Sequence, residues 1–391
     1  RLMRDAASEQ LLLRPLPAGE LMLHLNLSIL TSRARLRHLD LFPRPLAELF
    51  LGTSAERLRL SLSQGRWRSD DWGSLPAPLL PGGEVSAVFS ADRWRQGWPL
   101  MRRSLGVLLC SSFAQLETVR AQSSLAHFSG HAREGGQVGP WVVVRTALPQ
   151  QSVCTENLAA WLQLWPCRDK AGISSVLSQA DGLTAKRVRH SRYRGLQLTL
   201  EPHVFQASNH SRAALNLRLG FTVVLPGLST IEGVHKAGKQ GSSRTDLLGG
   251  LLRGGLQACV LASHSLLLIE LPDVYAATRV VSSTEDGPLK SVGQSGGVQR
   301  SNGILEWKLL ANTSMRLHLY GRQTNRATFQ ESVKDALSRQ EPLQTRRIVA
   351  RDDDSRGLMV LHLENKANSP AAISLVDRLP SWFLLQWHSL A

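Results

Sequence analysis

The stretch LMLHLNLSIL, residues 21–30, decides the class of fold. All of its odd-numbered positions carry Leu or Ile, whereas His24, Asn26 and Ser28 occupy even-numbered positions between them. Because the side chains of a β-strand point alternately to its two faces, this pattern is typical of a strand that buries one face. We therefore predict a strand over residues 21–30, with Asn26 on its outward face.

The same alternation of apolar and polar residues recurs along the chain. It appears at 58–62, 196–200, 215–223 and 315–319, and the apolar run 141–144 is typical of a strand that is buried on both faces. Strands at this density, separated by Gly- and Pro-rich turns, favour antiparallel sheets packed face to face. We predict an all-β fold of two antiparallel β-sandwich units with a few packed helices.

Two segments show the three- and four-residue spacing of helices instead. The first covers residues 100–116 and would place an apolar stripe, which includes Cys110, against a sheet face. The second covers residues 155–165, with Thr155 as its N-cap and Pro166 directly after its end. Cys154 precedes this second helix, so we expect its sulfur to project from a helix start and not into the core.

The chain has 391 residues, about two and a half times the ~150 residues of an average domain. Hydrophobic residues make up 42% and charged residues 20%, which allows a sizeable buried core and argues against global disorder. We predict a first β-sandwich domain with helical insertions over 1–280 and a second β-sandwich domain over 281–391. The Gly- and Ser-rich stretch 282–301 is the predicted linker.

The net charge of +15 favours acidic surroundings, such as nucleic acid, phospholipid head groups or an acidic protein. A basic run could provide such a contact, and it comprises Lys186, Arg187, Arg189, His190, Arg192 and Arg194. Only Tyr193 is interleaved as a stacking aromatic, so recognition of single-stranded nucleic acid is poorly supported. A solvated strand edge and a contact with an acidic partner or lipid both remain open. No stretch approaches the ~18 to 20 apolar residues of a membrane-spanning helix.

Residues that could carry catalysis do not form a recognisable set. Cys110 or Cys154 could be a thiol nucleophile with His131 as its base, but no sequence signature places these residues together. The triplet Asp352–Asp354 lacks the Gly and Glu of a calcium loop, and the cysteines lack the CxxC spacing of zinc sites. We predict no catalytic residue, no metal and no cofactor, and a buried structural thiol at Cys110.

Three Asn-x-Ser/Thr tripeptides begin at Asn26, Asn209 and Asn312. Such tripeptides accept N-linked glycans in the secretory pathway. They favour a chain that enters this pathway, and we predict glycosylation at all three.

One long segment of the chain is specific enough to indicate a family. It consists of VCTENL at 153–158, then Trp161, Leu164, the pair Pro166–Cys167, and KAG at 170–172. This segment closely resembles the PIG-T family, the lumenal, non-catalytic subunit of the GPI transamidase. Supporting blocks in the same order are PLPAG at 15–19, LFP at 41–43 and LSLSQGRWR at 60–68. The resemblance covers essentially the whole chain and weakens after about residue 180.

The resemblance implies a structural role at the lumenal face of the endoplasmic reticulum membrane. The GPI transamidase cleaves the C-terminal signal of a proprotein and joins the new carboxyl end to a GPI lipid. Its chemistry belongs to the PIG-K subunit, and the further implied partners are PIG-S, PIG-U and a Gaa-type subunit. Members of the family continue with more lumenal sequence and one C-terminal membrane helix, both of which we expect this chain to lack. The resemblance therefore implies that the second β-sandwich unit, over 281–391, is truncated and incomplete.

The resemblance also implies distinct roles for the four cysteines. In the family, the cysteine of the VCTEN block forms an intermolecular disulfide with the catalytic subunit, and Cys154 occupies that position. This leaves Cys167 and Cys259 as an internal bridge in an oxidising lumen, and Cys110 as a buried thiol.

Two other classes of protein stay open as alternatives. A secreted β-sandwich carbohydrate-binding module is one, and a hydrolase on the same scaffold would need two carboxylates that face each other across a groove. A basic nucleic-acid-binding protein would fit the net charge. The glycosylation tripeptides and the implied disulfides favour a compartment without nucleic acid, so we expect no such partner.

Overall fold

The computed structural model describes the parts of the chain that form its sheets and helices. The described residues are 5–16, 20–32, 36, 41–77, 79, 81–115, 119–122, 141–148, 151–167, 172–177, 185–207, 210–226, 245–246, 255–270, 279–284, 290–291, 298–299, 304–310, 314–321, 343–351, 357–365 and 370.

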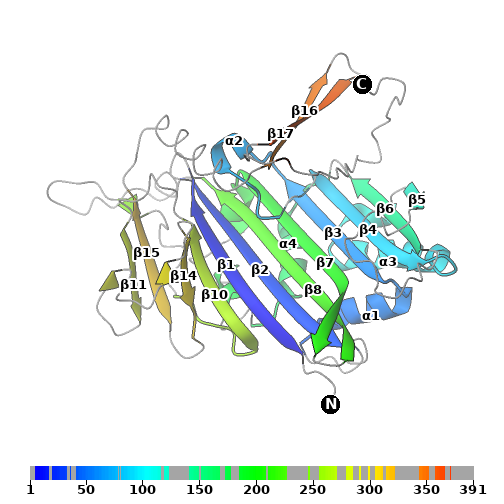
Figure 1. The fold of residues 1–391 in the computed structure, drawn as a ribbon, viewed down its shortest axis with the longest axis horizontal. Coiled ribbons are helices and arrows are strands. Elements are labelled where there is room, and N and C mark those ends of the chain that lie inside the picture. Colours follow the sequence, from blue (N-terminus) through cyan, green and yellow to red (C-terminus); the bar gives the residue numbers. More distant parts are fainter. Residues whose placement is uncertain are drawn as a thin grey trace.

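One large sheet of eleven strands dominates the molecule (Figure 1). Its strands, in spatial order, are β13 (Val298–Gln299), β14 (Ile304–Lys308), β10 (Ala262–Glu270), β1 (Ala6–Pro15), β2 (Leu21–Ser32), β8 (His210–Leu225), β7 (Tyr193–Ala207), β3 (Arg57–Gln64), β4 (Gly82–Ser90), β6 (Trp141–Leu148) and β5 (Val119–Gln122). Neighbouring strands are antiparallel except β1 and β10, which run parallel. The predicted strand at 21–30 is confirmed as β2.

Two smaller sheets and several helices complete the described structure. The second sheet contains β12 (Lys290–Ser291), β11 (Arg279–Thr284), β15 (Met315–Gly321) and β9 (Thr245–Asp246), and the third is the hairpin of β16 (Leu343–Arg351) and β17 (Gly357–Asn365). The helices are α1 (Arg44–Thr53), α2 (Ser69–Trp72), α3 (Trp94–Leu108), α4 (Thr155–Leu162) and α5 (Ala185–Arg189), with 3-10 turns η3 (Ser112–Gln115) and η5 (Ile173–Leu177). Among the described residues, no helix is long and apolar enough to cross a membrane.

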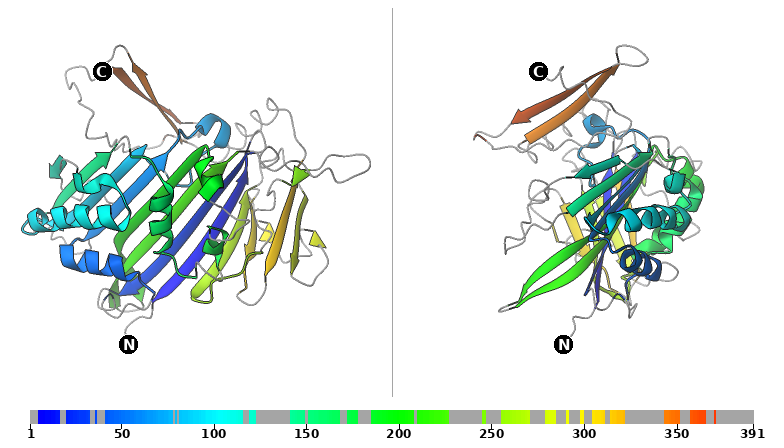
Figure 2. Two further views of the ribbon diagram at one scale, coloured as in Figure 1. Left: turned by 180° about the vertical axis from the view of Figure 1, so that it is seen from behind. Right: turned by 90° about the vertical axis from the view of Figure 1, so that its right-hand side faces the viewer.

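Helices α1, α3 and α4 cover one face of the large sheet (Figure 2). The odd-numbered residues of β2, from Leu21 to Ile29, are at most 1% exposed and belong to the same core as Phe50 of α1, Met101 of α3 and Trp161 of α4. Burying this apolar area, at roughly 25 cal/mol per Å², is the main favourable contribution to folding. The core therefore lies between the sheet and a layer of helices.

The opposite face of the sheet is mostly polar and carries a small aromatic cluster at one end. Trp67 contacts Trp72 and Tyr193 edge to face, with ring centroids 5.1 and 5.2 Å away. Beneath them, the buried carboxylate of Glu20 accepts hydrogen bonds from the indole N–H of Trp72 at 2.9 Å and from Arg68 at 2.8 Å. These contacts hold the short helix α2 against the polar face.

The mainly β class is confirmed, but the layers differ from the expected sandwich. Helices pack on the sheet where a second sheet was expected, and one strand pair, β1 with β10, is parallel. Alternation along a strand shows that one face is buried, and a helix with an apolar stripe buries that face as well as a sheet does. The boundary near residue 280 stays a prediction, and β13 and β14 from beyond it belong to the large sheet.

The first predicted helix begins and ends earlier than the interval 100–116. α3 spans Trp94–Leu108, and Phe113 reaches the core from the separate turn η3. Gly97 allows the helix to approach α1, because a Cβ at this position would lie 2.4 Å from the carbonyl oxygen of Thr53 and 2.9 Å from the ring of Phe89. A side chain at residue 97 would push α3 off the sheet.

His24 lies on the polar face of β2 and makes folding sensitive to acid. Its Nδ1 is 2.9 Å from the hydroxyl of Thr222. Burial, and to a lesser degree the charge of Arg14, lowers the pKa of His24 from 6.5 to about 4. Between these two pH values the unfolded chain binds more protons than the folded chain, so stability falls as the pH falls.

We expect the His24→Gln variant to lose part of this dependence on pH. Between pH 7 and pH 4, the free energy of unfolding should decrease more in the parent protein than in the variant, by at most on the order of 3 kcal/mol. Urea unfolding of both proteins at several pH values measures the difference. Parallel curves for the two proteins would show that His24 does not titrate in this range.

Candidate functional site

The site begins at Cys154, which is the N-cap of α4. Thr155 was predicted as the N-cap and is instead the first residue of the helix, so that prediction was wrong by one position. The reason is the side chain of Asn157, whose Oδ1 accepts a hydrogen bond from the backbone N–H of Cys154 at 2.9 Å. This is the reciprocal contact of a capping box, in which the third residue of the helix bonds back to the N-cap.

The Cys154 side chain lies at the protein surface and is half-buried. Its thiol donates a hydrogen bond of 3.0 Å to Oδ1 of Asn157. The expectation that the sulfur projects from a helix start agrees with this placement. It is a free thiol in the chain by itself.

Cys110 lies close to this helix start, and its side chain is exposed. The prediction of a buried thiol was therefore wrong. α3 ends at Leu108, and Cys110 adopts a left-handed conformation with φ of 51°. The backbone N–H groups of Cys110 and Ser111 bond to the carbonyls of Val107 and Gly106, as in a Schellman motif. The chain turns away from the helix axis at this point, which removes residue 110 from the apolar stripe.

A positive side chain lies on the other side of Cys154. Gln64 of β3 accepts hydrogen bonds at its Oε1 from the backbone N–H of Val153 at 3.1 Å and from Nη2 of Arg194 at 2.6 Å. Burial lowers the pKa of Arg194, and the nearby Cys154 partly opposes this effect. Arg194 also donates to the carbonyl of Val188 at 2.8 Å, which fixes the end of α5 beside the site.

Side chains that could bind a metal ion do not cluster among the residues that the structure describes. No group of three or more His, Cys, Asp or Glu side chains that could hold a metal ion occurs among them. His131 and Asp352–Asp354 lie outside the described residues, so the predicted roles of these side chains stay untested.

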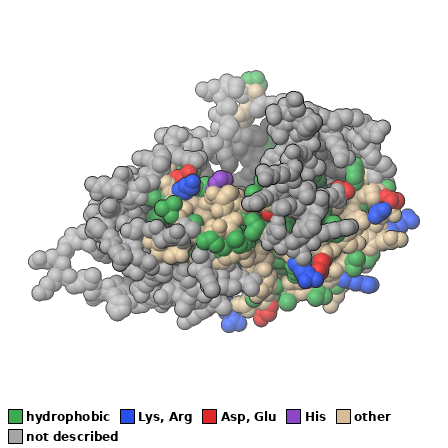
Figure 3. Space-filling view, turned by 90° about the horizontal axis from the view of Figure 1, so that it is seen from below, with side chains coloured by type: hydrophobic (Ala, Val, Ile, Leu, Met, Phe, Trp, Pro, Cys, Tyr) green, Lys and Arg blue, Asp and Glu red, His purple; other side chains and the backbone are tan. Residues whose placement is uncertain are grey.

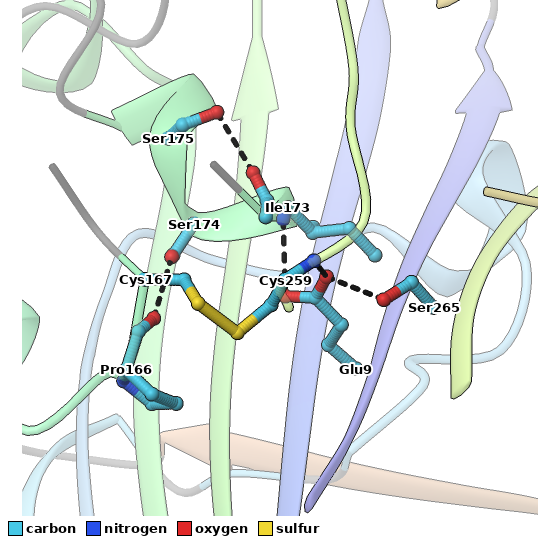
Figure 4. Close-up of a disulfide and its surroundings, with 9 residues drawn as sticks. Glu9, Pro166, Cys167, Ile173, Ser174, Ser175, Cys259 and Ser265 are labelled. Atoms are coloured by element: carbon cyan, nitrogen blue, oxygen red, sulfur yellow. Dashed lines mark hydrogen bonds between the residues drawn. A yellow bond between two sulfur atoms is a disulfide. The ribbon is translucent and has the colours of Figure 1, made fainter. Parts of the chain in front are cut away.

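Cys167 and Cys259 are joined in a disulfide, with their Cα atoms 5.6 Å apart (Figure 4). Gly172 passes directly beside the bridge with φ of +95°, where an added Cβ would lie 3.1 Å from the Cβ atoms of both cysteines. Glycine is suited to both the positive φ and the lack of space. This explains why a glycine occupies the third position of the KAG block.

A buried carboxylate lies beside this bridge and binds the backbone of Cys259. Glu9 of β1 is 3% exposed and accepts hydrogen bonds from the backbone N–H of Cys259 at 2.8 Å, the backbone N–H of Ile173 at 3.0 Å and the hydroxyl of Ser265 at 2.7 Å (Figure 4). Burial raises the pKa of Glu9, and these hydrogen bonds oppose the shift. Glu9 was not predicted from the sequence, although a charged residue between Ala7 and Leu11 on the apolar face of a strand was a visible signal.

Two arginines of the basic run form contacts within the chain. Arg192 forms an ion pair of 2.5 Å with Glu20, and Arg194 bonds to Gln64 and α5 as described above. On the face of the molecule shown in Figure 3, the described Lys and Arg side chains lie among Asp and Glu and do not gather in one basic patch. The predicted strand edge was wrong, because the run forms α5 and the start of β7, and β7 pairs with β8 on one side and β3 on the other.

Asn26 is the one predicted glycosylation site within the described residues; Asn209 and Asn312 lie outside them. Asn26 lies in the middle of β2 on the polar face, and its partner across to β8 is Gly220. Gly220 has no side chain, and the side chains nearest to the place of a Cβ at this position are those of Gln197 and His24, at 3.6 and 3.7 Å. Occupancy of this site stays a prediction.

Comparison with known proteins assigns the chain to a family. The family model described as "Gpi16 subunit, GPI transamidase component" matches residues 3–241. Similar proteins include the GPI-anchor transamidase component PIGT of Mus musculus and that of Homo sapiens, each 28% identical over 277 residues, or 68% of this chain and 44% and 45% of the relative. The GPI transamidase component GPI16 of Saccharomyces cerevisiae is 26% identical over 192 residues, or 43% of this chain and 31% of the relative.

The chain thus spans less than half the length of these relatives. The match of the family model includes the strands β1 to β8, the VCTENL segment with Cys154, and the first cysteine of the disulfide. Since the model matches more than half of the residues, the chain belongs to the Gpi16 family of GPI transamidase components.

Proposed function

We propose that this chain is a structural, non-catalytic subunit of the GPI transamidase, joined through Cys154 to the PIG-K-like catalytic subunit. The observation that carries the proposal is the placement of Cys154. Its thiol lies at the surface, at the start of a helix, and takes no part in the internal disulfide. A thiol in this position can form a disulfide with another chain without any change in the core.

The large sheet provides a rigid support for this thiol. α4 packs on the sheet through Leu158 and Trp161, which are 6% and 0% exposed. Gln64 of β3 contacts the residue before Cys154, so the helix start is tied to the sheet as well. In the proposed complex, the sheet and its helices position the catalytic subunit relative to PIG-S, PIG-U and the Gaa-type subunit at the lumenal face of the endoplasmic reticulum membrane.

A covalent link between subunits raises the local concentration of one near the other. Tethering of this kind turns a bimolecular association into an intramolecular one, which strengthens weak contacts without adding new ones. The proposed substrates of the complex, a proprotein and a GPI lipid, would then meet a catalytic subunit that does not dissociate. The peptide bond cleavage and transfer belong to that subunit.

Depletion of the full-length protein from the cells that make it tests the proposal. We expect GPI-anchored proteins to disappear from the cell surface and uncleaved proproteins to accumulate. Reintroduced tagged protein should restore anchoring and purify with the other transamidase subunits after mild detergent extraction. Normal anchoring in depleted cells, or purification without the catalytic subunit, would contradict the proposed role.

A further inference from the structure

Asn157 connects the ends of two helices through one buried side-chain amide. Its Oδ1 accepts hydrogen bonds from the backbone N–H of Cys154 at 2.9 Å and from the Cys154 thiol at 3.0 Å. Its Nδ2 donates to the carbonyl oxygens of Leu109 at 2.6 Å and Cys110 at 3.1 Å. An amide oxygen offers two lone pairs and an amide nitrogen two hydrogens, so these four contacts use the whole capacity of the side chain.

The burial of Asn157 makes this arrangement rigid. The residue is 0% exposed, so a broken contact would leave a polar group without a partner and without water. Such a group costs roughly 1 to 3 kcal/mol. The start of α4 and the end of α3 are therefore held together. The Cys154 thiol shares Oδ1 of Asn157 with its own backbone N–H, and it also contacts the exposed side chain of Glu156.

We propose that Asn157 is a positioning residue for the interchain disulfide: it fixes the direction in which the Cys154 sulfur meets a protein partner. The inference rests on the proposed function, because it concerns the same thiol. Nothing in the VCTENL pattern by itself distinguishes this role from ordinary helix capping. The distinction comes from the amide nitrogen of Asn157, which donates hydrogen bonds to the end of α3.

Formation of the link removes two electrons and two protons from two thiols, and a disulfide-bearing oxidoreductase accepts them. Cys154 first attacks the disulfide of the oxidoreductase and forms a mixed disulfide, which releases one thiol of that enzyme. The thiolate of the partner then attacks the Cys154 sulfur, and the second sulfur of the oxidoreductase leaves and takes up a proton. The backbone N–H of Cys154 keeps its contact with Asn157 after the thiol proton has been lost.

Orientation matters differently for the two kinds of reagent. A docked protein partner brings its sulfur from one direction, so its thiolate attacks more slowly when the Cys154 sulfur is misplaced. A small maleimide can approach Cys154 from any side. Its reaction is slowed by the hydrogen bond that holds the Cys154 thiol to Asn157. Loss of Asn157 should therefore slow the link to the partner and accelerate labelling by the maleimide, a split that simple destabilisation does not produce.

Three variants test this split in the full-length protein, in a Cys110→Ser background that leaves Cys154 as the free thiol among the described cysteines. Asn157→Ala removes all four contacts. Asn157→Asp keeps an oxygen that can accept from Cys154 but cannot donate to the carbonyls at the end of α3. Asn216→Ala is the matched control, because Asn216 is also buried, at 5% exposed, and bonds to Ser28 on the opposite face of the sheet.

Two measurements are made on each variant well below its unfolding temperature. Pulse-chase non-reducing electrophoresis gives the rate at which the reducible heterodimer forms, and maleimide labelling gives the reactivity of Cys154 in the chain alone. We expect the Asn157→Ala variant to form the heterodimer about tenfold more slowly than the parent, because displaced reacting groups commonly lose rate by this order or more. Maleimide should label Cys154 faster in this variant than in the parent. Asn157→Asp should label as slowly as the parent, and Asn216→Ala should change neither rate.

Specific results would overturn the inference. An unchanged rate of link formation in Asn157→Ala would show that the amide does not orient the sulfur. Equally fast labelling of the Asp and Ala variants would show that the oxygen does not restrain the thiol. If no heterodimer forms even in the parent, the proposed function fails, whereas the labelling rates still test the contact between Asn157 and Cys154.

Discussion

Replacing Cys154 with Ser is expected to abolish the reducible heterodimer with the catalytic subunit while leaving the chain folded. The link disappears completely because its sulfur is gone. The fold stays intact because Ser is a good N-cap and Cys154 takes no part in the internal disulfide. The change in the free energy of unfolding should stay within about 1 kcal/mol.

Non-reducing electrophoresis of the purified complex measures the effect directly. Cys110→Ser is the matched control, since Cys110 is also a free thiol near the surface and should leave the heterodimer unchanged. Noncovalent association of the two subunits should persist in the Cys154 variant at high concentration. A high-mass, reductant-sensitive band that survived in that variant would assign the link to another cysteine.

Removing the internal disulfide should cause the largest loss of stability. The bridge joins residues 92 positions apart, and closing a loop of this length restricts the unfolded chain by roughly 4 to 5 kcal/mol. The double variant Cys167→Ser with Cys259→Ser should lower the free energy of unfolding by about this amount. Urea unfolding followed by tryptophan fluorescence provides the measurement.

The surroundings of the bridge sharpen this expectation. Glu9 bonds to the backbone of Cys259 and to Ile173, so these contacts loosen once the two segments are no longer joined. The Cys110→Ser variant again serves as the control, because it removes a thiol without opening a loop. A loss of less than about 1 kcal/mol in the double variant would mean that Glu9 and the sheet hold the segments together without the bridge.

Local sequence patterns predicted individual strands well, but they predicted poorly which elements pack on those strands. The alternation at 21–30 located β2 because one face of a strand must be apolar where it meets a core, whatever forms the other layer. A helix near 100–116 was predicted to pack on a sheet face, but α1 and α4 were not predicted as parts of a layer that covers β2. The parallel pairing of β1 with β10 was not predicted either, because it joins segments that no short-range sequence pattern relates.

In the candidate site too, features set by local sequence were predicted, whereas contacts between distant segments were not. The position of Cys154 at a helix start was predicted to within one residue from Thr155 and Pro166, both of which act locally. Asn157 stands three residues after Cys154, which is the spacing of a capping box, so its contact with the helix start was visible in principle. Its bonds to Leu109 and Cys110 depend on where α3 ends in space, and no local rule gives that.

The parallel pairing of β1 with β10 has a consequence for synthesis of the chain. Glu9 and Cys259 are separated by 250 positions, and Arg14 and Glu270 by 256, so these contacts form only after most of the described chain has left the ribosome. Until then, one edge of β1 exposes unpaired backbone groups beside Leu11 and Leu13, and such an edge is prone to pair with other chains. Nascent molecules thus pass through a stage in which this edge can pair with other chains, and the large sequence separation of the missing contacts prolongs that stage.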